Sequence, residues 1–199
     1  DLRGGNVTNG MQLFERYCLT CHGTDGKGEV AVALNQDGLL KRADDEFLFR
    51  TLARGRGNTA MPAWAILDDR ELIDLVAYIR SWSTARPSVR RLNLPEADLA
   101  EGGLKYHFLC SRCHGEFGEG ETGPAIINAD FLDVATDAYL YETIASGREH
   151  TAMFGWATDV YNKEQLQNQD MANIIAYMRG AADAELTYVY PGSNPGQSD

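Results

Sequence analysis

The chain has 199 residues, 44% of them hydrophobic and 24% charged, which suffices for one ordinary domain or two small ones. Its formal net charge of −11 excludes nucleic acid as a partner, because contacts to phosphates require a surplus of Lys and Arg. No apolar run approaches the roughly 20 residues that a membrane-spanning helix needs. The sequence therefore predicts no transmembrane segment in this chain.

The first predicted helix leads into a Cys-x-x-Cys-His motif formed by Cys18, Cys21 and His22. Two thiols and an imidazole on one helical turn are the attachment site of c-type heme, in which the thiols bond to the porphyrin and the histidine binds the iron. On the helix before the motif, Gly10 allows a crossing helix to approach and Phe14 fills the gap beside it. A thioredoxin-like dithiol or a zinc ribbon would not need the histidine, and structural disulfides are the remaining alternative.

A middle helix, a loop and a terminal helix are predicted next. The middle helix has Asp44 as its N-cap and ends at Gly55. The terminal helix carries an apolar stripe at helical spacing. The stripe consists of Leu72, Leu75, Val76 and Ile79. Each half of the chain is therefore expected to form a three-helix unit.

The same elements recur in the second half at an offset of 92 residues, which predicts two similar units. The equivalent residues are Gly102, Tyr106, Cys110, Cys113, His114, Thr136 and Gly147. The pattern Gly-Arg-x-x-Thr-Ala-Met-x-x-Trp at 55–64 returns at 147–156. The terminal helix returns at an offset of 99, after seven extra residues around 159–167.

Met61 and Met153 are the predicted sixth ligands of the two heme irons. Each stands 39 residues after its heme histidine, inside the longest matched segment, whereas the other methionines lack such a match. A packing role is the alternative for both. A thioether ligand raises the reduction potential of heme iron, and six-coordinate iron has no open position for a substrate. The pattern therefore indicates single-electron transfer.

Several neighbours of the predicted ligands also recur. Arg56 and Arg148 could pair with heme propionates or be solvated loop residues, and the sequence leaves both alternatives open. Trp64 and Trp156 are interpreted as packing residues rather than as indole hydrogen-bond donors. His150 is interpreted as an exposed loop histidine rather than a ligand.

The combined motifs resemble the class I cytochromes c in their two-heme, two-domain form, from Gly10 to about Arg179. Residues 55–64 are also similar to the periplasmic heme domains of diheme subunits of cbb-type heme-copper oxidases. The resemblance implies an all-α fold of two tandem class I cytochrome c domains, each a small helical unit around one covalently bound heme c. In this family a proline after the heme motif presents its carbonyl to the proximal imidazole. Pro124 matches that proline, but Val32 stands at the aligned position of the first unit, where a backbone carbonyl could still serve. We expect the two hemes to be inequivalent.

The predicted organisation is an N-terminal cytochrome c domain at 1–84, a linker at 85–98, a C-terminal cytochrome c domain at 99–184 and an irregular tail at 185–199. Residues 1–91 carry 13 basic and 12 acidic side chains, a net charge of +1, whereas residues 92–199 carry 5 and 17, a net charge of −12. This asymmetry suggests two docking surfaces, the acidic one facing a basic partner. An acidic surface that only keeps the protein soluble is the alternative.

These observations predict a periplasmic diheme c-type cytochrome with two covalently bound heme c groups, which is not itself an enzyme. It would transfer single electrons between a donor and an acceptor protein, as a soluble carrier or as the electron-transfer subunit of a respiratory oxidase or dehydrogenase. Heme is attached to such motifs in an oxidising compartment outside the cytoplasm, and the start at Asp1 is expected after removal of a signal peptide. The alternatives are a diheme peroxidase or thiosulfate-oxidising enzyme with one labile distal ligand, and a heme-based sensor module.

Overall fold

The computed structural model describes residues 2, 4–57, 59–87, 92–157 and 165–183. Within these residues the protein is helical, with one isolated antiparallel bridge between Gly147 and Phe154. The first group of helices, called the N-terminal unit, comprises α1 (Val7–Tyr17), α2 (Leu19–His22), η1 (Thr24–Gly26), α3 (Asp37–Arg42), α4 (Asp45–Arg54) and α5 (Asp69–Ser81). The C-terminal unit comprises α6 (Leu99–Leu109), α7 (Ser111–His114), α8 (Ala129–Val134), α9 (Asp137–Ser146) and α10 (Asn168–Asp183). The predicted all-α fold is confirmed.

The first and last helices of each unit cross at a glycine. A Cβ on Gly10 would lie 2.0 Å from the carbonyl oxygen of Asp74 on α5, and a Cβ on Gly102 would lie 2.0 Å from that of Asn173 on α10. Phe14 is buried beside the first crossing, where its ring lies 5.6 Å from that of Tyr78. Both glycines therefore allow the close helix approach that the sequence predicts.

The ends of the middle helices α4 and α9 also agree with prediction. Asp44 accepts a hydrogen bond from the backbone N–H of Phe47 at 2.7 Å, and Thr136 accepts the equivalent bond at 3.1 Å. Gly55 and Gly147 end these helices with φ angles of 71° and 70°, a region that favours glycine.

The expectation of three helices per unit was incomplete. Each unit also contains a six-residue helix before its middle helix, α3 in one and α8 in the other. The one-turn helices α2 and α7 carry the second cysteine and the histidine of the heme motifs. Helices of four to six residues escaped the sequence analysis because they are too short to show helical periodicity.

The domain boundaries predicted at 84, 98 and 184 stay predictions. The tail predicted at 185–199, part of the predicted linker, and most of the extra segment of the second unit lie outside the described residues. Among the residues that the structure does describe, no helix combines the length and the apolar character needed to cross a membrane.

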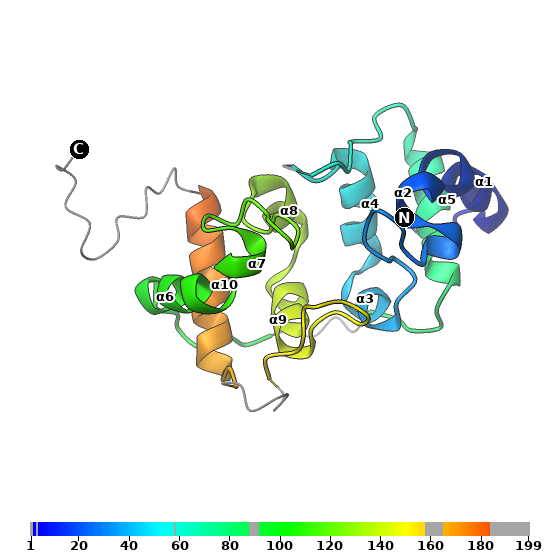
Figure 1. The fold of residues 1–199 in the computed structure, drawn as a ribbon. Coiled ribbons are helices and arrows are strands. Elements are labelled where there is room, and N and C mark those ends of the chain that lie inside the picture. Colours follow the sequence, from blue (N-terminus) through cyan, green and yellow to red (C-terminus); the bar gives the residue numbers. More distant parts are fainter. Residues whose placement is uncertain (1, 3, 58, 88–91, 158–164, 184–199) are drawn as a thin grey trace, which may run out of the picture.

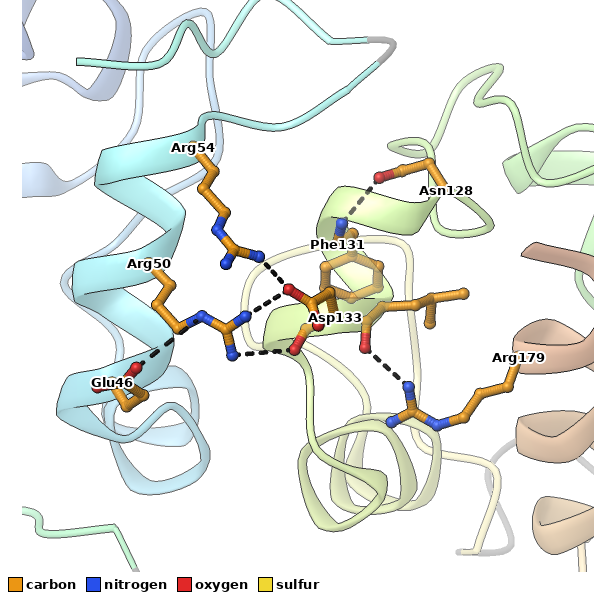
Figure 2. A network of polar contacts seen from close by, with 8 residues as sticks. Glu46, Arg50, Arg54, Asn128, Phe131, Asp133 and Arg179 are labelled. Carbon is orange, nitrogen blue, oxygen red and sulfur yellow. Dashed lines mark hydrogen bonds and ion pairs between the residues drawn. The ribbon is translucent and has the colours of Figure 1, made fainter. Parts of the chain in front are cut away.

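The two units lie side by side, with α4 against α8 and α3 against α9 (Figure 1). Because α3 and α4 are the sequence equivalents of α8 and α9, this contact is close to a two-fold symmetric one. At its centre the equivalent rings of Phe47 and Tyr139 stack with their centroids 4.4 Å apart. Beside the stack, Arg50 and Arg54 of α4 both bond to Asp133 of α8, as Figure 2 shows.

Candidate heme-binding sites

The two Cys-x-x-Cys-His motifs adopt the same local structure. Cys18 is the C-cap of α1, and its carbonyl accepts the backbone N–H of His22 at 2.9 Å. Cys110 holds the equivalent position after α6, and its carbonyl accepts the N–H of His114 at 3.0 Å. No two of the four cysteines are joined by a disulfide. Each motif therefore presents two thiols and one imidazole from a single turn, as heme attachment requires.

The first thiol of each motif lies in an apolar environment. Burial, with a smaller contribution from Cys21, raises the pKa of Cys18 to about 11. Burial, with a smaller contribution from Cys113, raises the pKa of Cys110 to about 12. Such environments favour an uncharged sulfur over a thiolate, and a thioether is uncharged.

The histidines of both motifs are buried and oriented by a backbone carbonyl. The Nδ1 of His22 lies 2.9 Å from the carbonyl oxygen of Val32, and the Nδ1 of His114 lies 2.8 Å from that of Pro124. With the hydrogen on Nδ1, the N–H donates to the carbonyl and the lone pair of Nε2 is free to bind a metal. The carbonyl of Val32 thus takes the part that the carbonyl of Pro124 plays in the second unit, as the sequence left possible.

The loops that carry Met61 and Met153 have one structure. In the first loop, the N–H of Arg56 donates to the carbonyl of Met61 at 3.0 Å, and the N–H of Met61 donates to the hydroxyl of Thr59 at 3.1 Å. The second loop repeats these bonds at 2.7 and 3.1 Å among Arg148, Met153 and Thr151. The repeated Thr-Ala-Met pattern therefore builds a fixed turn that holds a half-buried methionine. Ligation of iron by either sulfur stays a prediction.

Buried donors without partners support a bound group that carries carboxylates. Among the described residues, the Nε1 atoms of Trp64 and Trp82 and the Nε atoms of Arg42 and Arg148 are buried and have no hydrogen-bond partner. An unpaired buried donor costs about 1–3 kcal/mol. Trp64 packs against Tyr17, the residue before the first heme cysteine, with their rings 5.3 Å apart. The heme propionates would supply acceptors, so the residues present fit a heme.

The two loop arginines point into the contact between the units. The guanidinium of Arg56 lies 4.1 Å above the ring of Phe131, and Nη1 of Arg148 lies 3.5 Å from the hydroxyl of Tyr139. Both arginines are half-buried, so neither is the solvated loop residue of the alternative interpretation. His150 is exposed, as expected, and its φ of 58° lies in the left-handed region.

One residue of this region escaped the sequence analysis. Arg42, at the end of α3, donates from Nη2 to the carbonyl of Gly147 at 3.1 Å and so reaches the methionine loop of the other unit. Its equivalent in the second unit is Val134, so the repeat gives no sign of a role for Arg42. The available signal was a charged residue at a position of the repeat that is apolar in the other copy.

Comparison with known families gives a match over most of the chain. A family model described as cytochrome c oxidase, cbb3-type, subunit III matches residues 5–79 and 97–178. The two matched segments contain the two Cys-x-x-Cys-His motifs and both methionine loops. They are consistent with two cytochrome c domains in tandem, as predicted.

Curated relatives and a solved structure show the same breadth of similarity. The cbb3-type cytochrome c oxidase subunit CcoP of Cereibacter sphaeroides is 26% identical over 191 residues, covering 88% of this chain and 61% of the relative. The cytochrome bc1 complex cytochrome c subunit of Corynebacterium diphtheriae is 21% identical over 195 residues, covering 89% and 67%. The chain thus spans about two thirds or less of these relatives. A reducing HAO-like protein complex from Kuenenia stuttgartiensis has the same fold, with a TM-score of 0.52 at 20% identity over 89% of this chain and 97% of that one.

Proposed function

The chain belongs to the family of cytochrome c oxidase, cbb3-type, subunit III, and from this premise we propose that it passes single electrons between two redox-partner proteins. Its cytochrome c domains imply covalently attached heme c, and its two cysteine pairs are consistent with two hemes. It would act in the periplasm, as a soluble carrier or as the electron-transfer subunit of a respiratory oxidase or dehydrogenase. The named relatives are subunits of a cbb3-type oxidase and of a bc1 complex, which favours the second role.

The observation that carries this proposal is the repetition of one binding geometry in both units. In each unit a carbonyl orients the heme histidine, and a hydrogen-bonded turn presents a methionine. Bound heme supplies an iron centre that exchanges one electron. The protein would attach it through the cysteines, hold the imidazole with its Nε2 free, and add a thioether ligand that raises the potential.

Electron transfer rather than catalysis follows if both irons are six-coordinate. His22 with Met61, and His114 with Met153, would then leave neither iron an open position for a substrate. The acidic C-terminal unit would dock a basic partner, since opposite charges steer association. The N-terminal unit, which is nearly neutral, would dock the other partner.

Replacement of Met61 or Met153 by Ala tests the ligand assignment. Each variant should alter the spectrum and lower the midpoint potential of one heme only, and should lose half of the weak methionine-to-ferric-iron charge-transfer band. Spectroelectrochemical titration of the purified holoprotein measures both quantities. Met11→Ala is the control, because Met11 lies on α1 at 37% exposure and aligns with a glycine in the second unit. Unchanged spectra and potentials in both variants would refute the assignment, and a high-spin ferric component in the unaltered protein would favour an enzyme.

A further inference from the structure

Three arginines from both units converge where the units meet. Arg42 extends from α3 to the backbone of the loop that carries Met153, and its Nε remains buried without a partner. Arg148 belongs to that same loop and also has a buried Nε without a partner. Arg56 opens the loop of Met61 and covers the ring of Phe131 in the other unit. We call Arg42, Arg56 and Arg148 the interdomain arginine cluster.

The members of this cluster are close enough to affect one another. Burial is the largest cause that lowers the pKa of Arg42, and the charge of Arg148 lowers it further. The same two causes lower the pKa of Arg56. These effects are opposed at Arg42 by Tyr139, and less strongly by Glu149 and Glu142, but burial keeps the pKa below its ordinary value. The region therefore concentrates three guanidinium groups, and burial withdraws two of them, Arg42 and Arg56, from water.

Such a concentration fits an anion with two oxygens. Buried guanidinium N–H groups without acceptors are costly, and a carboxylate satisfies them in pairs because its geometry matches the guanidinium fork. The backbone N–H of Arg56 donates to the carbonyl of Met61, and that of Arg148 donates to the carbonyl of Met153. The cluster is therefore attached to both loops that would face the hemes. A heme carries carboxylates of this kind on its propionates.

The cluster is not symmetric between the two units. Arg56 and Arg148 are equivalent in the repeat, but Arg42 aligns with Val134. The N-terminal unit therefore contributes a cation that has no counterpart in the C-terminal unit. Arg42 donates to the carbonyl of Gly147, next to Arg148. Its side chain therefore reaches the loop that carries Met153 in the C-terminal unit.

We propose that the interdomain arginine cluster binds heme propionates, and that Arg42 of the N-terminal unit sets the reduction potential of the C-terminal heme. A fixed cation near a heme disfavours the ferric state, which carries one more positive charge than the ferrous state, and so raises the potential. Arg42 is then one physical cause of the expected inequivalence of the hemes. The inference rests on the proposed attachment of two hemes.

Arg42→Met in the holoprotein tests the proposal. The midpoint that Met153→Ala identifies as that of the C-terminal heme should fall, while the other midpoint moves less. At equilibrium, the ratio of electrons on the C-terminal heme to electrons on the N-terminal heme should fall about tenfold. This corresponds to 59 mV for a one-electron couple. Arg42→Lys keeps the charge and should shift the midpoint by less than half as much. Arg50→Met is the matched control, because Arg50 also joins the units but pairs with Asp133 and Glu46.

The outcomes separate this inference from the proposed function. An Arg42→Met protein with two attached hemes and unchanged midpoints, or with both midpoints shifted equally, would overturn it. A C-terminal midpoint that responds to added phosphate in the unaltered protein, but not in Arg42→Met, would show that the cluster binds a solution anion instead. A preparation that lacks two hemes by the pyridine hemochrome assay would contradict the proposed function itself. If Arg42→Met fails to incorporate heme, the midpoints of Arg42→Lys decide. A small fall of the C-terminal midpoint alone supports the inference, and equal shifts of both midpoints would overturn it.

Discussion

At the scale of single residues, the tightest contact in each unit lies at a glycine of the first helix, where no side chain would fit. Gly10 and Gly102 face a backbone carbonyl of the crossing helix rather than the flexible end of a side chain. A backbone atom on a packed helix cannot move aside without shifting the whole helix, so an added methyl group has nowhere to go. This crossing also positions the turn of the heme motif, since α1 and α6 run directly into it.

Gly10→Ala and Gly102→Ala should each lower the free energy of unfolding of the holoprotein by at least about 2 kcal/mol, because overpacking against backbone costs 1–3 kcal/mol or more. Gly180→Ala is the control. Its added Cβ would lie 3.2 Å from the end of the exposed Leu99 side chain, which can move. That change should leave stability the same or raise it by about 0.5–1 kcal/mol. Denaturant titration measures all three, and equal stability of Gly10→Ala and Gly180→Ala would contradict the close crossing.

At the scale of elements, an arginine near the end of each terminal helix joins three parts of its unit. Arg179 donates to the carbonyls of Leu132 and Ala135 at 2.7 Å and pairs with Asp137 at 2.6 Å. Arg80 makes the same set of contacts in the N-terminal unit. The two arginines are equivalent at the offset of 99 residues. Each one satisfies the last carbonyls of a short helix and so fixes that helix against the terminal one.

Arg179→Met should destabilise the holoprotein by about 2–3 kcal/mol, because it removes charge-assisted bonds and leaves carbonyls without a donor. Arg179→Lys should recover less than half of this loss, since an ammonium group cannot reach three acceptors in the fork geometry of a guanidinium. Lys27→Met is the control. Lys27 is 71% exposed, so its loss should change stability by less than about 0.5 kcal/mol. Thermal and denaturant unfolding give the comparison, and full recovery by lysine would argue against the fork.

At the scale of the whole molecule, the units meet through complementary charges as well as stacked rings. In the ion pairs across the contact, Arg50 and Arg54 of the N-terminal unit face Asp133 of the C-terminal unit. Part of the opposite charge of the two halves therefore pairs across the contact between the units. Exposed ion pairs contribute only about 0–1 kcal/mol each, so the stacked pair of Phe47 and Tyr139 must supply much of the remaining attraction.

Asp133→Lys should loosen the contact at low ionic strength by bringing three cations together, and small-angle scattering of the full chain should show a larger radius of gyration. The effect should diminish in about 1 M salt, where the screening length is about 3 Å. Asp133→Asn should change stability by less than about 1 kcal/mol. Combining Asp133→Lys with Arg50→Asp should restore part of the compact arrangement. An unchanged radius for Asp133→Lys at low salt would show that these charges do not hold the units together.

Features contained within one turn or one loop were predictable because their partners are close in sequence. The heme motifs, the caps at Asp44 and Thr136, and the glycines that end the middle helices are of this kind. The repeat extended the prediction to pairs that are farther apart, since Gly10 and Tyr78 had counterparts in Gly102 and Tyr177. The carbonyl of Val32 was harder to identify, because every residue has a carbonyl and only the fold selects one.

The amino-acid sequence by itself determined the helical class, the two-unit repeat and the heme-attachment motifs, because each depends on spacing along one chain segment. Only the tertiary structure decided how the units meet. It placed Arg42 against Gly147, 105 residues away in the chain, and it set Phe47 on Tyr139. Neither contact has a local signal, since a surface helix with a few charges is compatible with many partners until packing selects one. The proposed difference in charge between the two heme sites, which comes from Arg42, therefore exists only because the two units are in contact.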